Sequence, residues 1–273
     1  MKLNKKFLIF FLFFLWVVIP ALAADLFDTS QKYADQNGRY TPARVIVHNN
    51  IIKNYLQKMV RIKSRKTPNA IFMAGGSGAG KSTALNKLAE KGVLILPDYV
   101  IINSDDIKEM IPEYNQFKKV DSGKAADLVH KESSYLSDKV LDQAKMRKSS
   151  FILDGTFSWV EDSKKQLQSL PGYQTKIIYV DAPIEVALKR VKARGDATGR
   201  YVPDDYVRSS NDRIRKNIDE LTKFATNTFF ILSSDSITLK KISWQNGKYK
   251  IVNRPVDLLT PDQVKEFKSI LDP

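Results

Sequence analysis

The chain has 273 residues, of which 43% are hydrophobic and 27% charged, and its formal net charge is +14. This length suits one α/β domain with additions, and the absence of cysteine excludes a disulfide framework, so a packed core must stabilise the fold. Lysine and arginine are spread along the chain, which indicates a solvated basic surface or an attraction for anionic substrates or nucleic acid.

The N-terminus has the order of a secretory signal peptide. Lysines precede an apolar run at residues 7–19, and Pro20 is followed by an Ala-Leu-Ala sequence that ends at Ala23. We therefore predict a signal peptide over residues 1–23 that is cleaved after Ala23, with no stable membrane insertion of the mature chain. The alternative is an uncleaved anchor, because the uncharged stretch 7–24 is just long enough to span a bilayer. In both cases the rest of the chain is exported, to the periplasm or outside the cell.

Residues 24–66 form the expected lead-in to the first strand. Up to residue 43 the sequence is polar and is interrupted by Asn37-Gly38 and by Pro42, as in a segment that lies over a domain. From Arg44 to Val60 apolar residues recur at helical spacing, which predicts an amphipathic helix packed beside the sheet.

A complete phosphate-binding loop follows the strand-like run 70–74. The loop reads Gly-Gly-Ser-Gly-Ala-Gly-Lys-Ser, and helical spacing over residues 81–91 places it at a helix N-terminus, where anions bind. Backbone N–H groups would surround a polyphosphate, Lys81 would contact its β- and γ-phosphates, and the Ser82 hydroxyl would bind Mg²⁺. The predicted ATP contacts are Gly75, Gly76, Ser77, Gly78, Ala79, Gly80, Lys81, Ser82 and Thr83.

The second expected strand, residues 100–103, delivers two carboxylates, Asp105 and Asp106, to the sheet edge where the loop opens. Phosphoryl transfer has a loose transition state, so an ordinary aspartate can orient a hydroxyl and accept its proton late. We expect one of the two aspartates to act as this base. The alternative is that Ser104, Asp105 or Asp106 only caps a helix that begins near Ile107.

A third strand-like run, residues 151–153, ends in Asp154. An apolar strand that ends in a carboxylate resembles the strand that carries the Mg²⁺-water aspartate in phosphate-loop enzymes. The alternative is that Asp154-Gly155 is only a turn after a buried strand.

Arginines gather farther along the chain. Arg190 and Arg194 lie near the end of a predicted helix, and a glycine-flanked flexible loop at residues 195–199 leads to Arg200. Arginines beside a hinged loop can close over the γ-phosphate and stabilise its transition-state charge. Taken singly, each arginine can instead be a solvated helix residue or a complement to the helix dipole.

Strand and helix patterns alternate from residue 67 to residue 232, which specifies a parallel sheet with helices on both faces. A hairpin is expected over residues 237–252 around Asn246-Gly247, and a capping box at Thr260 starts a last helix that runs to about Leu271. The histidines, His48 and His130, lack the spacing of a metal site and are expected in packing or surface positions. The remaining expected strands are 175–180 and 228–232, and the helices are 124–147, 160–169, 183–194 and 204–225.

This ordered set of motifs resembles the zeta toxin family of phosphate-loop kinases, which phosphorylate UDP-N-acetylglucosamine. The matching segments are 75–83, 103–108, 154–156 and 199–203, and the sequence from Gly38 to Arg44 with His48 resembles the lead-in of some members. Many members have glutamate at the position of Asp154 and an arginine shortly after the Gly-Thr, where this chain has Phe157-Ser158.

The resemblance implies a role for each matched residue. Asp105 would be the base that faces the acceptor hydroxyl, and Lys81 and Ser82 would hold the triphosphate and Mg²⁺. Arg200, with Arg194 or Arg190, would close on the phosphates. Asp154 and Thr156 would lie near the acceptor, and Glu132 would join them.

The expected protein is thus an exported ATP- and Mg²⁺-dependent kinase. Its phosphate-loop domain would cover residues 67–232, followed by a hairpin and helix extension at residues 233–273. The best expected acceptor is a hydroxyl of a UDP-sugar. The alternatives are a polynucleotide or nucleoside kinase, and a nucleotide-binding switch or interaction protein with little turnover. Family analogy also suggests an antitoxin partner, although an exported chain need not have one.

Overall fold

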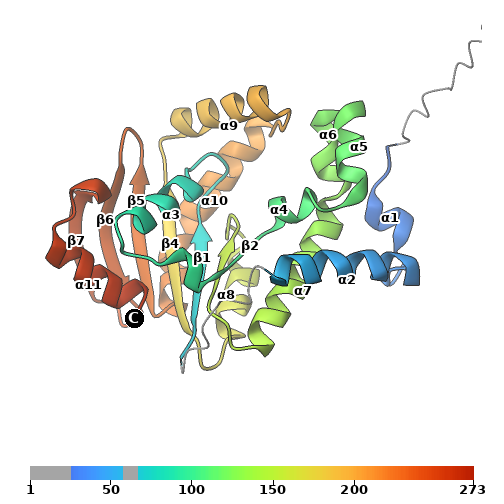
Figure 1. The fold of residues 1–273 in the computed structure, drawn as a ribbon. Coiled ribbons are helices and arrows are strands. Elements are labelled where there is room, and N and C mark those ends of the chain that lie inside the picture. Colours follow the sequence, from blue (N-terminus) through green and yellow to red (C-terminus); the bar gives the residue numbers. More distant parts are fainter. Residues whose placement is uncertain (1–25, 58–66) are drawn as a thin grey trace, which may run out of the picture.

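The computed structural model describes residues 26–57 and 67–273 (Figure 1). The predicted signal peptide and the end of the helix expected up to Val60 lie outside these residues. Within the described ranges, no helix combines the length and the hydropathy that crossing a bilayer requires.

The centre of the molecule is a sheet with the strand order β2-β3-β1-β4-β5-β6-β7. Strands β1 to β5 are parallel, and β6 and β7 continue the same sheet in antiparallel pairing. The predicted α/β fold is therefore confirmed, including its C-terminal hairpin. The strands are β1 Asn69–Ala74, β2 Val100–Asn103, β3 Phe151–Asp154, β4 Gln174–Asp181, β5 Asn227–Ser233, β6 Ile237–Trp244 and β7 Tyr249–Pro255.

Helices cover both faces of the sheet because successive residues of β1 belong to two different cores (Figure 1). Phe72 lies in the core that packs α2, α5, α7, α8 and α10, whereas Ile71 and Met73 lie in the core beneath α3 and α11. The helices are α1 Thr29–Tyr33, α2 Pro42–Gln57, α3 Lys81–Glu90, α4 Ser104–Lys108, α5 Pro112–Val120, α6 Ser122–Leu128, α7 His130–Met146, α8 Val160–Gln168, α9 Ile184–Thr198, α10 Asp204–Leu221 and α11 Pro261–Leu271, with 3-10 turns at Leu96–Asp98, Thr222–Phe224 and Val256–Leu258.

The segment between β2 and β3 differs from the prediction of a single helix at residues 124–147. The structure has α4, α5, α6 and α7 in this segment. Pro112 occupies the first turn of α5, and the Asp121 carboxylate caps α6 by accepting hydrogen bonds from the N–H groups of Gly123 and Lys124. The prediction missed these helices because caps, rather than a long apolar period, define them.

The flexible loop predicted at residues 195–199 is wrong, because α9 continues to Thr198. Gly195 is buried inside α9 against the ring of Tyr201, and a Cβ atom at Gly195 would lie 2.6 Å from Tyr201 Cδ1. Gly199, with a φ of 71°, ends the helix as its C-cap. Arg200 therefore directly follows the C-cap of α9.

A buried polar network fixes the C-terminal helix to the sheet. Lys176 in β4 is fully buried, and its ammonium group donates hydrogen bonds to Asn69 Oδ1 at 2.8 Å and to the Leu271 carbonyl oxygen at 2.9 Å. Asn69 Nδ2 donates to the Tyr99 hydroxyl, which donates to Asp272. These contacts join β1 and β4 to the end of α11, at the end of the sheet away from the phosphate loop.

Candidate active site

The phosphate loop connects β1 to α3 in the manner expected from the sequence. Gly80 precedes α3 with a left-handed φ of 89°, a conformation that favours glycine. Because Gly80 has no side chain, it offers no cap to the first N–H groups of α3. These donors therefore remain for an anion at the helix N-terminus.

Neighbouring elements hold the loop in shape. The Ser77 N–H donates to Ser210 Oγ at 3.1 Å, and Asn211 Nδ2 donates to the Ser77 carbonyl oxygen at 3.0 Å, so α10 supports the loop. On the other side, the Gly75 N–H donates to the Thr156 carbonyl oxygen at 3.0 Å. The loop is thus tied to the segment that follows β3.

Lys81 lies back over the loop. Its ammonium group donates to the carbonyl oxygens of Gly75 and Gly76 at 3.0 and 3.2 Å. Burial lowers the pKa of Lys81, and the charges of Asp154 and Asp105 oppose this effect. The carboxylates of Asp154 and Asp105 are therefore close enough to the Lys81 ammonium group for their charges to affect its pKa.

Asp105 sits in the first turn of α4, where Asn103 supplies the helix cap. Asn103 Oδ1 accepts the Asp105 N–H at 2.8 Å, so the Asp105 carboxylate is not needed for capping. This carboxylate forms ion pairs with Arg200 and, at 3.2 Å, with Lys108. Burial raises the pKa of Asp105, but the hydrogen bond from Arg200 and the charge of Lys108 outweigh burial, so the net pKa is lowered.

Asp154 is the last residue of β3, which pairs with β2, the strand that leads to Asp105. Its carboxylate accepts a hydrogen bond from Asn103 Nδ2 at 3.2 Å, so Asn103 bridges the two aspartate segments. Burial raises the pKa of Asp154, the charge of Lys81 opposes this, and the charges of Asp105 and Asp106 add to it. The Thr156 hydroxyl is hydrogen-bonded to Ser158 at 3.1 Å.

The three predicted arginines have different positions. Arg200 contacts Asp105 directly, and the pKa of Arg194 is lowered by burial and by the nearby charge of Arg200. Arg190 instead donates to Ser233 Oγ at 2.9 Å and to the Ser234 carbonyl oxygen at 3.0 Å. Arg190 Nη1 also donates to the Ala79 carbonyl oxygen of the phosphate loop at 3.4 Å, so Arg190 lies between that loop and the end of β5. Arg200 therefore pairs with Asp105, and Arg194 lies close enough for the charges of Asp105 and Arg200 to affect its pKa.

Glu132 does not face this group in the structure. Its side chain is fully buried in α7, where it accepts hydrogen bonds from Arg44 Nε at 2.6 Å and pairs with His48 Nε2 at 2.6 Å. A contact of Glu132 with an acceptor stays a prediction. The observed contacts give Glu132 a place in an internal ion-pair network.

A cavity of about 280 Å³ is lined by Asp154 and by Ser104, the residue before Asp105. It contains Asp154 and Thr156, as expected, and also residues that the sequence analysis missed. The available signal was a polar stripe at helical spacing in α7, formed by Ser134, Ser137 and Asp138. The cavity is lined by Met73, Ser104, Ser134, Ser137, Asp138, Leu153, Asp154, Gly155, Thr156, Phe157, Ser158, Trp159, Asp162, Ser163 and Gln166.

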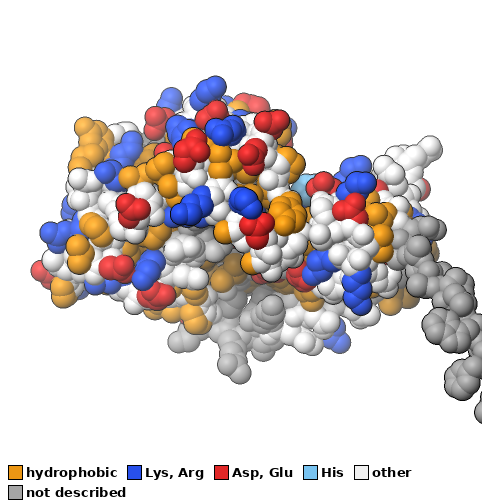
Figure 2. Space-filling model, turned by 90° about the horizontal axis from the view of Figure 1, so that it is seen from above, with side chains coloured by type: hydrophobic (Ala, Val, Ile, Leu, Met, Phe, Trp, Pro, Cys, Tyr) orange, Lys and Arg blue, Asp and Glu red, His pale blue; other side chains and the backbone are white. Residues whose placement is uncertain are grey.

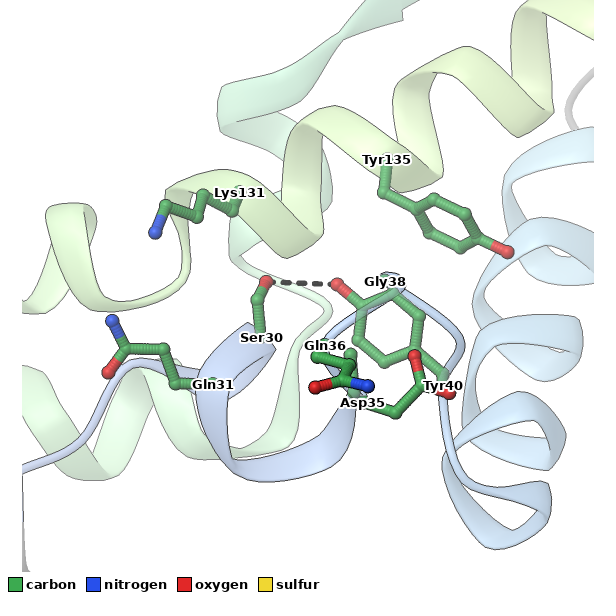
Figure 3. Close-up of a pocket in the computed structure, with 9 residues that line it drawn as sticks. Ser30, Gln31, Asp35, Gln36, Gly38, Tyr40, Lys131 and Tyr135 are labelled. Atoms are coloured by element: carbon green, nitrogen blue, oxygen red, sulfur yellow. Dashed lines mark hydrogen bonds between the residues drawn. The ribbon is translucent and has the colours of Figure 1, made fainter.

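A larger hollow of about 550 Å³ lies elsewhere, between α1, the turn after it and α7 (Figure 3). Ser30 and Tyr40 form a hydrogen bond of 2.9 Å across it, and Lys131 and Tyr135 approach from α7 (Figure 3). None of its lining residues belongs to the phosphate loop or to the aspartate group. The smaller cavity, beside Asp154, is therefore the candidate acceptor pocket, and it is called the acceptor pocket below.

The residues present fit a Mg²⁺ ion held with a nucleotide. In the described part of the chain, no cluster of three or more acidic or histidine side chains could hold a metal by itself. Mg²⁺ commonly takes one or two protein ligands together with phosphate oxygens and water, and Ser82 and Asp154 suit that arrangement.

The charged surface around the site is mixed. On the face that carries α9, basic and acidic side chains are interspersed (Figure 2). This pattern favours a solvated surface over a continuous basic track for nucleic acid.

Solved structures share this fold. They include a structure of the PezAT chromosomal toxin-antitoxin system of the human pathogen Streptococcus pneumoniae, with a TM-score of 0.60 and 17% identity over 85% of this chain and 94% of that chain. The AvrRxo1-ORF1:-ORF2 complex has a TM-score of 0.65 and 16% identity, over 89% of this chain and 82% of that chain, and an AvrRxo1 structure with ATP has a TM-score of 0.62.

The curated relatives that the chain matches include kinases. A calmodulin calcium-dependent NAD kinase of Arabidopsis thaliana is 31% identical over 102 residues, which cover 35% of this chain and 19% of the plant protein. This chain therefore spans less than a fifth of that relative's length. Human adenylate kinase isoenzyme 1 is 27% identical over 173 residues, covering 59% of this chain and 78% of the human enzyme.

The family model for zeta toxin matches residues 52–239. The matched region is more than half of the chain and contains the phosphate loop, Asp105, Asp154 and Arg200. The resemblance inferred from the motifs is thereby confirmed, and the chain belongs to the zeta toxin family of phosphate-loop kinases.

Proposed function

We propose that this protein is an ATP- and Mg²⁺-dependent kinase that phosphorylates a hydroxyl of a small anionic acceptor, with a UDP-sugar such as UDP-N-acetylglucosamine as the first candidate. The observation that carries the proposal is the meeting of Asp105 with Arg200 beside Lys81 and the acceptor pocket. Asp105 as the base, Lys81 and Arg200 as the phosphate-binding side chains, and the pocket for the acceptor are then close to one another.

The reaction would follow from these positions. The acceptor oxygen attacks the γ-phosphorus while the bond to the oxygen of ADP breaks, and the hydroxyl proton passes to Asp105. Lys81 and the first N–H groups of α3 hold the triphosphate, and Arg200 moves from Asp105 toward the transferred phosphoryl group. Bound Mg²⁺, held by Ser82 and Asp154 with the phosphates, would neutralise charge on the phosphate oxygens.

A dinucleotide such as NAD is a second candidate acceptor. It is favoured by the 31% identity with the plant NAD kinase over 102 residues. NAD and a UDP-sugar share a diphosphate and a sugar hydroxyl, so both suit a site that accepts an anionic, hydroxyl-bearing molecule. A polynucleotide or nucleoside kinase would use the same phosphate loop and base, and a nucleotide-binding switch would use the loop with little turnover.

The protein's surroundings are also part of the proposal. ATP is scarce outside the cytoplasm, so an exported kinase would meet ATP after delivery into another cell, such as a host or a competitor. An antitoxin or immunity protein is a further proposed partner, supported by the similar fold of the PezAT toxin-antitoxin system.

The test uses residues 24–273 with ATP, Mg²⁺ and a panel of UDP-sugars, NAD, nucleosides and oligonucleotides. We expect one acceptor class to gain the mass of one phosphate. Asp105→Asn should retain ATP binding and lose at least about a hundredfold in kcat, because a positioned base contributes that much. Asp212→Asn, which alters an exposed aspartate paired with Arg215 on α10, is the matched control.

The outcomes separate these functions. If ATP binds but no acceptor is modified, the kinase proposal fails and a nucleotide-binding switch is favoured. If only oligonucleotides are modified, and their binding weakens steeply with salt, a polynucleotide kinase replaces the small-molecule kinase.

A further inference from the structure

The acceptor pocket lacks a cation for an anionic acceptor. Its lining holds three aspartates, Asp138, Asp154 and Asp162, and no lysine or arginine among the described residues. Burial raises the pKa values of Asp138 and Asp154, but the pocket still offers hydroxyl and carboxylate oxygens rather than positive charge. A sugar suits such a lining, whereas a phosphate would be repelled. The phosphate of a nucleotide-like acceptor must therefore lie at the edge of the pocket.

Trp159 forms part of that edge. It lines the pocket, directly precedes α8, and remains 62% exposed. Arg213 of α10 stacks on the indole, with its guanidinium carbon 4.1 Å from the ring centroid. A guanidinium that stacks on an aromatic face keeps its in-plane N–H groups available at its edge.

Arg213 has an unused donor. Its Nε atom is buried without a hydrogen-bond partner, and within the described residues it has no acidic group within ion-pair distance. Nearby arginines on the same helix differ, since Arg208 pairs with Glu185 and Arg215 pairs with Asp181 and Asp212. Arg213 therefore carries a positive charge that the rest of the described protein does not neutralise by direct contact.

The position of Arg213 connects the pocket with the phosphate loop. Ser210, one turn earlier on the same side of α10, accepts a hydrogen bond from the Ser77 N–H of the loop at 3.1 Å. Arg213, three residues after Ser210, contacts Trp159. A phosphate at Arg213 would thus be outside the ATP loop but next to the acceptor pocket.

We propose that Arg213, held against Trp159, is a specificity-determining residue that binds a phosphate of the acceptor while the acceptor's sugar enters the pocket beside Asp154. This inference rests on the proposed function and names the chemistry of its acceptor: a phosphate ester joined to a hydroxyl-bearing sugar.

The first experiment compares kinetics. Arg213→Met is expected to raise the KM for UDP-N-acetylglucosamine or NAD, whichever the wild type phosphorylates, by about ten- to a hundredfold, as the loss of a charge-assisted hydrogen bond does. The KM for ATP should remain unchanged. Arg215→Met on the same helix is the matched control, because Arg215 contacts Asp181 instead of Trp159. Trp159→Ala should raise the acceptor KM less than Arg213→Met, since it removes only the stack.

A binding experiment separates this inference from the kinase proposal. UDP and NAD are titrated into the full protein after saturation with a non-hydrolysable ATP analogue, so that the phosphate loop is occupied. Wild type should bind at least one of them, and Arg213→Met should bind it about ten- to a hundredfold more weakly. This result would support the inference even if no acceptor were phosphorylated.

Three results would overturn the inference. They are equal binding by the wild type and Arg213→Met, no binding of either probe to the wild type, and a rise in the KM for ATP instead of the acceptor. If Arg213→Met fails to fold, Arg213→Lys replaces it. Lysine keeps the charge without the planar fork, so the affinity of this variant should fall below that of the wild type. An unchanged affinity in Arg213→Lys, together with unchanged affinity in Trp159→Ala, would also overturn it.

Discussion

The neighbours of Asp105 determine whether its carboxylate is free of helix capping and whether it is charged. Asn103 caps α4, which frees the Asp105 carboxylate, and Arg200 and Lys108 hold that carboxylate in its charged form. A charged carboxylate can accept a proton, but one that is paired with Arg200 is a weak base. Movement of Arg200 to the γ-phosphate would relieve this pairing at the moment when the base is needed.

The residue-scale prediction concerns Arg200→Ala. Since Arg200 lowers the pKa of Asp105, its removal should raise that pKa and move the acid limb of the kcat/KM profile to higher pH. The rate at neutral pH should fall by about 10³-fold or more if Arg200 also contacts the transferred phosphate. The measurement is a pH–rate profile with the acceptor found above. Arg208→Ala, on the surface of α10, serves as the control. An acid limb that stays in place would contradict the coupling of Arg200 to Asp105.

At the scale of elements, a buried ion-pair network joins the lead-in to the helices behind the site. Arg44 of α2 binds Glu132 of α7 and, through Nη1 and Nη2 at 2.8 Å, Glu113 of α5. His48 completes the contact with Glu132. Because α5 follows α4 directly, the network also fixes the segment that carries Asp105. The Arg44 and His48 positions noted in the lead-in thus have a structural role.

The element-scale prediction concerns Glu132→Gln. Glu132→Gln removes the buried carboxylate that Arg44 and His48 share and leaves Glu113 as the remaining acidic partner of Arg44, so the free energy of unfolding should fall by about 3 kcal/mol, the lower end of the cost of breaking a buried ion pair. Glu161→Gln, which removes a 72% exposed partner of Lys164, should change it by less than about 1 kcal/mol. Urea unfolding measures both. A cost for Glu132→Gln as small as that of the control would contradict the network's importance.

Glu132→Gln should also change how the free energy of unfolding depends on pH. Burial raises the pKa of Glu132, but hydrogen bonds from His48 and Arg44 outweigh burial and lower it from 4.5 to about 2. The stabilisation by Glu132 is therefore present above pH 4.5 and is lost as the pH falls toward 2. Wild type should lose stability across this interval, and Glu132→Gln should lose less.

At the scale of the whole molecule, the predicted signal peptide and the net charge bear on the proposed export and on the proposed acceptor. Removing residues 1–23 takes away three lysines, so the net charge changes from +14 to 14 − 3 = +11. The remaining basic charge is intermixed with acidic side chains on the face around α9 (Figure 2). On this face, such mixed charge does not form the continuous basic track that a polynucleotide would follow, which agrees with the proposed small acceptor.

The prediction at this scale concerns export. Expression of the full chain in a producing cell should yield an exported protein whose N-terminal residue is Ala24. N-terminal sequencing and fractionation provide the measurement. Ala23→Phe should block cleavage and leave the larger form with the membrane, because the peptidase requires a small residue at this position. Full-length, uncleaved wild-type chain in the producer's cytoplasm would contradict both export and delivery.

The sequence by itself determined the elements whose signals are local. Apolar runs bounded by turn residues specified β1 to β5, Gly75 to Ser82 specified the phosphate loop, and Asn246-Gly247 with the Thr260 capping box specified the C-terminal hairpin and helix. Each depends on neighbours within a few residues, so pattern and spacing suffice.

Only the tertiary structure decided the features that depend on contacts between distant segments. The flexible loop predicted at residues 195–199 is wrong, because the packing of Tyr201 against Gly195 within α9 has no signature along the chain. The ion-pair network of Glu132 with Arg44 was not predicted, because it joins residues far apart in sequence. The pocket beside Asp154 and the stack of Arg213 on Trp159 likewise arise where α7, α8 and α10 meet. Burial and charge pairing between separate helices set these properties, and no local pattern carries them.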